Sequence, residues 1–186
     1  IILQLLKILF SKIKNKDNLL RIAINSKTIS LSIRPGLKYH KKFIGILNNY
    51  KRPIPHLKNL YYKKIINLIN MANSQNQEII LCNKNLLLEG CTTNIICISN
   101  KKIYIPTRNY YIGCTVRYIL GNTKRKIIKS NISINNLNKY EEILLVGSGK
   151  GVVSLSSIPQ IDWQSKSDLV YKEFVQLYKK ILWRIM

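Results

Sequence analysis

The sequence predicts an α+β protein, in which short strands gather into sheets and helices pack outside them. Apolar residues make up 46% of the 186 residues, which is enough to bury a real core. Short apolar segments bounded by Gly, Pro and Asn cluster in the chain, as short strands do. Segments with a helical period stand between and after these clusters. Because strands and helices do not alternate strictly, a doubly wound parallel sheet is not expected.

The first part of the chain predicts a helix, a hairpin and an irregular connection. The turn signal Asn25-Ser26-Lys27 separates the two strands of the hairpin, and Arg34-Pro35-Gly36 ends the second. The connection contains Pro53 and Pro55 and has no clean period, so we expect a boundary inside it. These elements are the helix 1–14, the strands 19–24 and 28–33, and the connection 36–55.

The rest of the chain predicts helices and further short strands. Ile65, Ile66 and Leu68 fit one face of the first helix, together with Tyr61. Gly121 is expected to end the second helix. The predicted helices are 58–72, 115–120 and 167–182, and the predicted strands are 78–82, 86–88, 93–98, 102–105, 126–129, 142–146 and 152–155.

The formal net charge of +23 would ordinarily suggest a polyanionic partner. However, Lys outnumbers Arg 24 to 7, and Ile, Lys and Asn together supply 76 residues, which is the bias of an A/T-rich coding sequence. The basic residues are also scattered rather than interleaved with aromatics in one stripe. We therefore expect no specific nucleic-acid partner, and no membrane partner either, because no apolar run approaches the roughly 20 residues of a membrane span.

The four cysteines do not form a metal site by their spacing. Cys82, Cys91, Cys97 and Cys114 include no CxxC pair, and both histidines lie far from them in sequence. Each lies among apolar residues or threonines of an expected strand or strand end. We expect no metal, and buried reduced thiols in an intracellular compartment.

A carboxylate interrupts the segment Leu88-Glu-Gly-Cys-Thr-Thr-Asn-Ile95 at the end of a strand of leucines. If Glu89 is partly desolvated there, it requires a positive or hydrogen-bonding partner. The alternative is a surface glutamate in a turn.

Two further segments are rich in glycine or small residues. Ile112-Gly-Cys-Thr-Val116 precedes a helix, where free N–H groups and the Thr115 hydroxyl would suit a phosphate, although an ordinary helix cap would look the same. Val146-Gly-Ser-Gly-Lys-Gly-Val-Val153 could wrap an anion, but it lacks the GxxxxGK[ST] spacing of a nucleotide-binding loop. An ordinary glycine-rich hairpin is the alternative.

From about residue 19 to the end, the order of these segments resembles the class IV aminotransferases. This family contains branched-chain and D-amino-acid aminotransferases and aminodeoxychorismate lyase. The stretches that carry the resemblance are Pro55-His-Leu-Lys-Asn-Leu-Tyr-Tyr62, Leu88-Glu-Gly-Cys-Thr-Thr-Asn-Ile-Ile96, Tyr111-Ile-Gly-Cys-Thr115 and Glu141-Glu-Ile-Leu-Leu-Val-Gly-Ser-Gly149.

The resemblance implies a pyridoxal 5′-phosphate enzyme with Lys58 as the catalytic residue that holds the cofactor. Burial beside a cationic cofactor would lower the pKa of a lysine amine enough for it to act as a nucleophile and then move a proton. Glu89 would face the pyridine nitrogen. The cofactor-binding residues that the resemblance implies are Lys58, Tyr62, Glu89, Asn94, Cys114, Thr115 and Ser148.

The chain also departs from the family pattern. Asn59 and Tyr61 stand where the family has Thr and Asn after the lysine, and Val116 stands where an Arg is common, with Arg117 one place later. The resemblance implies the large domain of a D-amino-acid aminotransferase-like fold, a pseudo-barrel of mixed sheet with outer helices, over residues 51–186. Residues 1–50 would be the end of a smaller α+β domain, with about 100 residues of it upstream. A homodimer in the cytoplasm is implied, or in an organelle stroma or matrix if a transit peptide precedes the chain.

The segment 146–159 is most similar to aminodeoxychorismate lyase members, which release pyruvate and form 4-aminobenzoate for folate synthesis. Transamination of branched-chain or D-amino acids is the alternative. An inactive relative, or a basic protein that binds nucleic acid, is the other class of function that the sequence leaves open.

Overall fold

The computed structural model describes residues 2–11, 18–36, 42–59 and 62–183, and the chain divides into two compact units. The first unit is Ile1–Lys38 and the second is Tyr39–Met186. The division lies earlier than the boundary at residue 50 that the sequence suggested, because strand β3 (Lys42–Asn49) pairs into the sheet of the second unit. That the first unit is the end of a small domain stays a prediction.

The first unit contains helix α1 (Ile2–Ser11) and an antiparallel hairpin of β1 (Asn18–Ile24) and β2 (Ile29–Pro35). The side chain of Asn25 closes the hairpin turn, because its Oδ1 accepts hydrogen bonds from the backbone N–H groups of Lys27, at 2.8 Å, and Thr28, at 2.7 Å. The predicted hairpin is therefore confirmed, and the described part of the predicted first helix ends at Ser11.

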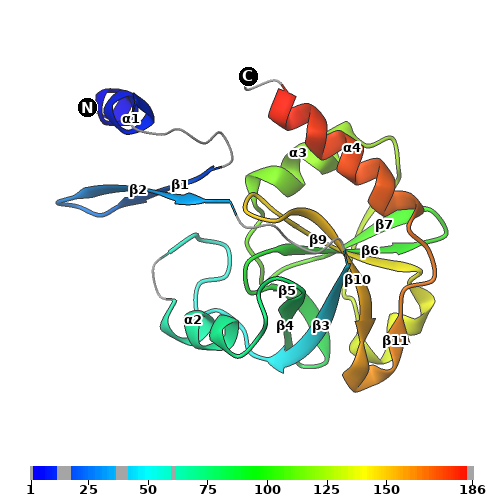
Figure 1. The fold of residues 1–186 in the computed structure, drawn as a ribbon. Coiled ribbons are helices and arrows are strands. Elements are labelled where there is room, and N and C mark those ends of the chain that lie inside the picture. Colours follow the sequence, from blue (N-terminus) through cyan, green and yellow to red (C-terminus); the bar gives the residue numbers. More distant parts are fainter. Residues whose placement is uncertain (1, 12–17, 37–41, 60–61, 184–186) are drawn as a thin grey trace. The chain divides into compact units, whose positions relative to one another are not determined.

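The second unit is built on a mixed, curled sheet of nine strands among the described residues, shown in Figure 1. Neighbouring strands run in the order β5-β4-β3-β10-β9-β6-β7-β8, with β11 beside β10. Strand β3 is parallel to both its neighbours and β7 is parallel to β8, whereas the other pairs are antiparallel. The α+β class is confirmed. The remaining elements are β4 (Gln77–Asn83), β5 (Leu86–Gly90), β6 (Asn94–Ser99), β7 (Lys102–Pro106), β8 (Ile127–Ser130), β9 (Glu142–Gly147), β10 (Gly151–Ile158), β11 (Trp163–Gln164), α2 (Lys63–Asn70), α3 (Cys114–Asn122), α4 (Leu169–Trp183) and the short helices η1 (Ile134–Lys139) and η2 (Pro159–Ile161).

Strand alternation separates the two faces of this sheet. In β9, Ile143 and Leu145 join a cluster that also contains Tyr140 and Trp163, whereas Leu144 faces the other way. On that other face, α3 and α4 cover one part of the sheet, and α2 packs over β4 in a separate cluster. The helices therefore lie outside the curled sheet, as the sequence predicts.

Strand β3 is the longest element that the sequence failed to predict; β11 and the short helices η1 and η2 were also missed. It lies between β4 and β10, and Phe43 is fully buried. In the sequence, residues 43–47 of this strand are apolar or glycine without a polar residue between them, so the period of two residues was absent from this segment.

Two helices differ from the prediction at their ends. Helix α2 begins at Lys63 rather than Lys58, which leaves Lys58 in the preceding loop. Helix α3 continues past Gly121 to Asn122. Ile66 points away from the core and is 53% exposed, although Ile65 and Leu68 are buried as expected, and Tyr61 lies outside the described residues.

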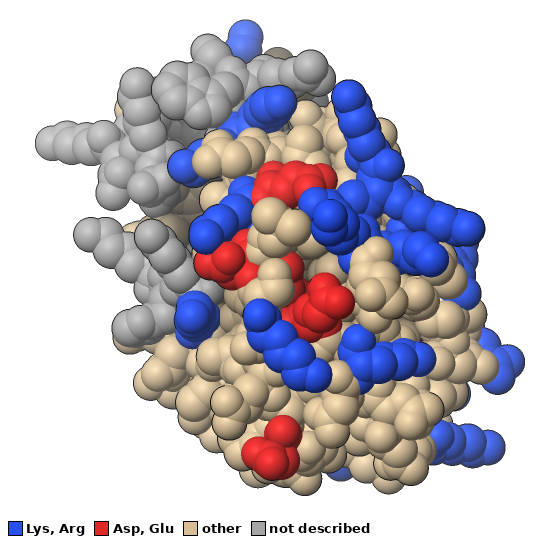
Figure 2. All heavy atoms as spheres, turned by 90° about the vertical axis from the view of Figure 1, so that its right-hand side faces the viewer, with Lys and Arg blue, Asp and Glu red and all other residues tan. Residues whose placement is uncertain are grey.

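The basic side chains are spread over the face shown in Figure 2 and surround a small group of carboxylates. On this face they form no continuous stripe, which agrees with the scattered pattern of the sequence. None of the described helices is long and apolar enough to cross a membrane.

Candidate active site

Glu89 is a buried carboxylate at the end of β5. It is 3% exposed, and its Oε1 lies 2.8 Å from Nε of Arg52. The backbone N–H of Tyr111 donates a hydrogen bond to Oε2 at 3.3 Å. Burial raises the pKa of Glu89 to about 7, although the charge of Arg52 and the Tyr111 hydrogen bond both act to lower it. The desolvated carboxylate with a positive partner is therefore present, and the surface alternative is wrong.

Arg52 and Glu89 form an ion pair whose geometry is poor for a hydrogen bond. Arg52 Nε and Glu89 Oε1 are buried, and neither makes a hydrogen bond of good geometry within the described chain. Arg52 is instead fixed by its Nη2, which donates to the carbonyl of Cys91 at 2.7 Å, and by the ring of Tyr62, 5.7 Å from the guanidinium carbon. Glu89 Oε1 is therefore ion-paired with Arg52 but has lone-pair capacity left for a further hydrogen-bond donor.

Asn94 ties the start of β6 to the segment before α3. Its Nδ2 donates to the carbonyl of Tyr111, and its Oδ1 accepts from the N–H of Gly113 at 3.0 Å. Tyr111 also donates to Glu89, so the segment between Tyr111 and Gly113 is held at both ends. Asn94 thus acts on the backbone that aims α3.

Thr115 and Ser148 form a pair of hydroxyls at the start of α3. Their Oγ atoms are 3.0 Å apart, and Thr115 is buried whereas Ser148 is exposed. The first N–H groups of α3 have no partner within the helix, and Gly113 provides no side-chain cap. Two hydroxyls beside a free helix N-terminus suit the oxygens of a phosphate.

Lys58 lies in the loop before α2 and is exposed. Its Nζ is 5.7 Å from the centroid of the Tyr111 ring. The described residues alone therefore do not bury Lys58, and its role as the residue that holds the cofactor stays a prediction. Tyr111 nevertheless connects Lys58 to Glu89, since its ring faces the lysine and its backbone N–H bonds the carboxylate.

The remaining predicted residues have different surroundings. Tyr62 packs with the apolar cluster of α2 and faces Arg52, so it supports the partner of Glu89. Cys114, expected to be buried, is exposed at the first residue of α3. Cys82, Cys91 and Cys97 are buried free thiols, and no group of residues suited to a metal ion occurs in the described ranges.

Sequence reasoning missed four residues of this region. Arg52 was hidden among the many basic residues, and Tyr111 was noted only as part of a motif. Glu78 and Lys150 form a buried ion pair between β4 and the turn after β9, and they are 72 residues apart. Only the presence of a lone acidic residue at the start of an apolar strand could have indicated Glu78.

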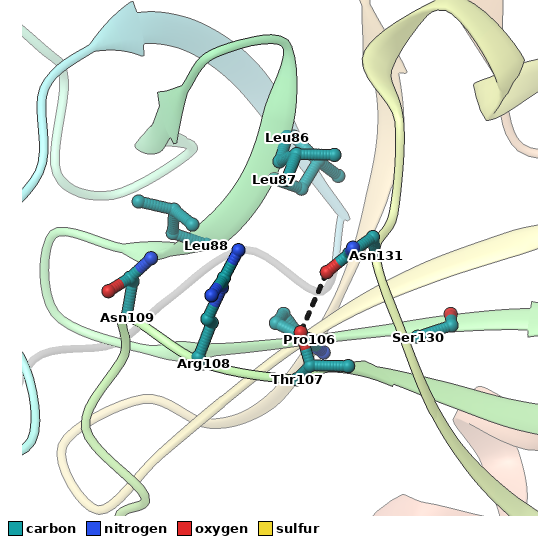
Figure 3. A pocket seen from close by; sticks show the side chains of 9 residues that line it. All are labelled: Leu86, Leu87, Leu88, Pro106, Thr107, Arg108, Asn109, Ser130 and Asn131. Atoms are coloured by element: carbon teal, nitrogen blue, oxygen red, sulfur yellow. Dashed lines mark hydrogen bonds between the residues drawn. The ribbon is translucent and has the colours of Figure 1, made fainter.

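A separate shallow pocket lies between the ends of β5 and β7 (Figure 3). Arg108 projects into it, and Thr107 Oγ1 is bonded to Asn131 Oδ1 at 2.7 Å on one side. None of the predicted cofactor-binding residues lines it. The lining residues are Leu86, Leu87, Leu88, Pro106, Thr107, Arg108, Asn109, Ser130 and Asn131.

A comparison with known protein families identifies one family. Residues 8–158 match the family described as Amino-transferase class IV. The chain belongs to this family. No curated protein sequence matches the chain, so the remaining comparisons are with solved structures.

Several class IV aminotransferase structures share the fold at low sequence identity. A protein from Legionella pneumophila, provisionally described as a 4-amino-4-deoxychorismate lyase, is 16% identical, with a TM-score of 0.72 over 82% of this chain and 60% of that one. The branched-chain amino acid aminotransferase of Escherichia coli is 15% identical, with a TM-score of 0.64 over 80% of this chain and 54% of that one. A hypothetical aminotransferase from Mycobacterium tuberculosis in its PLP-bound form is 13% identical, with a TM-score of 0.73 over 87% of this chain and 67% of that one. The class IV chain described here therefore spans about 60% of the length of the Legionella protein.

Proposed function

We propose that this class IV chain binds pyridoxal 5′-phosphate covalently through Lys58 and acts on a small amino-acid-type substrate. The observation that carries the proposal is the buried Glu89, which has a pKa of about 7 and an oxygen without a hydrogen bond. A carboxyl group with a pKa near neutrality can exchange a proton with a ring nitrogen under working conditions.

The described residues fit the parts of this cofactor. The unsatisfied Oε1 of Glu89 suits the protonated ring nitrogen, and the Thr115–Ser148 hydroxyl pair suits the phosphate. Lys58 stands over the ring of Tyr111, which links it to Glu89. When bound, the cofactor supplies an electron sink for the substrate carbon that loses a proton.

Four residues of this chain would have distinct roles in the reaction. Lys58 lies in a loop and is exposed, so its amine can reach a carbonyl group and then accept and return a proton. Glu89 would hold a proton at the ring nitrogen. The charge of Arg52 lowers the pKa of Glu89 and so opposes the effect of burial. Asn94 fixes the backbone at Gly113 and so aims the N-terminus of α3.

For the reaction, we propose release of pyruvate from 4-amino-4-deoxychorismate to give 4-aminobenzoate, a step of folate synthesis. The likeness of the segment 146–159 to lyase members supports this choice, and the similar Legionella fold is compatible with it. The similar fold of the Escherichia coli branched-chain aminotransferase supports transamination as the second candidate. By the family resemblance, we further propose a homodimer.

The cofactor test must separate Lys58 from the other 23 lysines of the chain. The protein is mixed with pyridoxal 5′-phosphate, reduced with borohydride and digested, and the modified peptide is identified by mass spectrometry. Lys64→Ala is the matched control, because Lys64 is also exposed and its Nζ stands 5.4 Å from a tyrosine ring, that of Tyr50. We expect Lys58→Ala to abolish the stoichiometric adduct and its near-visible absorbance, and Lys64→Ala to keep both.

Modification spread evenly over many lysines would overturn the proposal, and tight, salt-sensitive binding of DNA or RNA by the same preparation would favour the basic-protein alternative. If Lys58 carries the adduct, 4-amino-4-deoxychorismate and branched-chain 2-oxo acids are then compared as substrates. Formation of 4-aminobenzoate with pyruvate indicates the lyase, and amino-group transfer to the oxo acid indicates the transaminase.

A further inference from the structure

A second buried carboxylate lies beside the candidate site and has no part in the proposed chemistry. Glu78, at the start of β4, is 3% exposed. It forms an ion pair with Lys150, whose side chain is only 7% exposed and whose Nζ also lies 4.8 Å from the ring centroid of Phe43. Burying both charges is costly unless their geometry and remaining hydrogen bonds are good.

The hydrogen bonds of Glu78 come from the turn that joins Glu89 to Asn94. The backbone N–H of Thr92 donates to Oε1 at 2.8 Å, and the Thr92 hydroxyl donates to both carboxylate oxygens, at 3.0 and 3.1 Å. The hydroxyl of Thr93 adds a longer bond at 3.3 Å. Glu78 therefore organises residues 90–94, the carboxylate turn, which follows Glu89 and ends at Asn94.

Lys150 lies in the turn between β9 and β10, residues 147–151. This turn also carries Ser148, and we name it the phosphate turn. The two turns touch directly, because a Cβ on Gly147 would lie only 3.0 Å from the carbonyl oxygen of Thr92. Strands β6 and β9 are neighbours in the sheet, and Asn94 is paired with Val146 at their ends. The ion pair thus crosses from one turn to the strand that supports the other.

We infer that Lys150 and Glu78 are positioning residues that hold the phosphate turn, with Ser148, in register with the carboxylate turn, with Glu89 and Asn94. This inference rests on the proposed function for the meaning of the two turns, but the physical link between them does not. Ser148 is exposed and sits in a glycine-rich turn, where the Tyr178 hydroxyl donates to its carbonyl at 3.4 Å and the Thr115 hydroxyl lies 3.0 Å from its own. Lys150 adds the buried ion pair that ties this turn to β4. The pair would therefore set the distance between the groups that hold the two ends of the cofactor.

The test uses the full chain with the double variant Lys150→Met/Glu78→Gln. Removing both charges avoids leaving one of them buried alone, so the variant is expected to fold. The matched control is Glu142→Gln, because Glu142 is equally buried and accepts from Ser167 Oγ and from the N–H groups of Val170 and Tyr171, far from either turn along β9.

Two readouts are measured on each protein. The first is hydrogen exchange in the two turns without any ligand, and the second is the ratio of the Kd for pyridoxal to the Kd for pyridoxal 5′-phosphate, which reports the phosphate alone. We expect faster hydrogen exchange in both turns of the double variant. We also expect its Kd ratio to fall about tenfold, which corresponds to the loss of one hydrogen bond. Glu142→Gln should speed exchange only at the start of α4 and keep the ratio.

The outcomes distinguish the inference from the proposed function. Unchanged exchange in either turn of the double variant, or an unchanged ratio when the unaltered chain binds both ligands, overturns the positioning role. If the unaltered chain forms no adduct at Lys58, the proposed function fails, and faster exchange in both turns still supports the pair as their link. A ratio that falls equally in Glu142→Gln would show a general loss of stability and would also overturn the inference.

Discussion

Glu78 and Glu89 lie on neighbouring strands of one sheet and are both 3% exposed, yet their surroundings differ. Glu78 accepts hydrogen bonds from two threonines and pairs with Lys150. Glu89 accepts a single backbone hydrogen bond from Tyr111, and its contact with Arg52 leaves Oε1 without one. A buried carboxylate with a full set of donors holds the fold together, whereas one with an unsatisfied oxygen is available to a ligand.

The surroundings of Glu89 also change its pKa and that of a neighbouring thiol. Burial raises the pKa of Glu89 to about 7, and burial together with the charges of Glu78 and Glu89 raises the pKa of the Cys91 thiol to about 12. The Cys91 thiol therefore stays protonated near neutrality and is a poor nucleophile. Of Glu89 and Cys91, Glu89 is the group suited to proton exchange near neutral pH.

We expect the largest loss of stability when Glu78 is substituted. Glu78→Gln leaves the Lys150 ammonium buried without its counter-charge, and we expect the free energy of unfolding to fall by about 3–5 kcal/mol. Glu89→Gln should cost less at neutral pH, because the ionised form of Glu89 is itself disfavoured by burial. Urea denaturation of the two variants at neutral pH measures both values, and an equal loss would contradict the contrast between the two carboxylates.

A pH series examines Glu89 more closely. Below its ordinary pKa of 4.5, Glu89 is protonated in both states and contributes no pH dependence. Between 4.5 and about 7 only the unfolded chain releases the proton, so the contribution of Glu89 to the free energy of unfolding falls as pH rises, by on the order of 3 kcal/mol in total. The wild-type and Glu89→Gln stabilities should therefore diverge in this window by that amount, and parallel curves from acid to neutral pH would show that the pKa is not raised.

Gly90 lies between Glu89 and the threonines that bind Glu78. We expect its substitution to have the next largest effect on the free energy of unfolding. An added Cβ would lie 2.2 Å from Thr93 Oγ1 and 2.7 Å from Glu78 Oε1, so Gly90→Ala must displace the groups that satisfy Glu78. We expect a loss of about 1–3 kcal/mol in urea denaturation. Gly121→Ala is the control, because its Cβ would meet nothing within 4 Å and alanine favours the helix, so that variant should be no less stable.

The smallest effect on stability is predicted at the phosphate end. Thr115→Val keeps the volume of the side chain and removes one partner of the 3.0 Å hydroxyl pair with Ser148, so the free energy of unfolding should change by only about 1 kcal/mol. The affinity for pyridoxal 5′-phosphate should nevertheless fall more than that for pyridoxal. If both affinities fall equally in a binding titration, the hydroxyl pair does not hold the phosphate.

Local patterns predicted the elements of this fold where one face of a segment is buried. The hairpin turn at Asn25 follows from the hydrogen bonds that its own side chain makes to nearby backbone. The short gap between the predicted strands 93–98 and 102–105 is a tight turn, in which Asn100 and Lys101 adopt positive φ. Strand β3 escaped prediction because residues 43–47 lack the alternation of apolar and polar residues that marks a strand.

The sequence by itself determined the class of the fold and the order of the motifs that carry Lys58, Glu89 and Thr115. Only the tertiary structure decided that Arg52 is the partner of Glu89, and that Glu78 is satisfied by Lys150 from 72 residues away. The physical reason is that periodicity and turn chemistry depend on residues within a few positions of one another. Which charge meets which carboxylate depends on strand register and loop closure, and these also left Lys58 exposed and Glu89 buried.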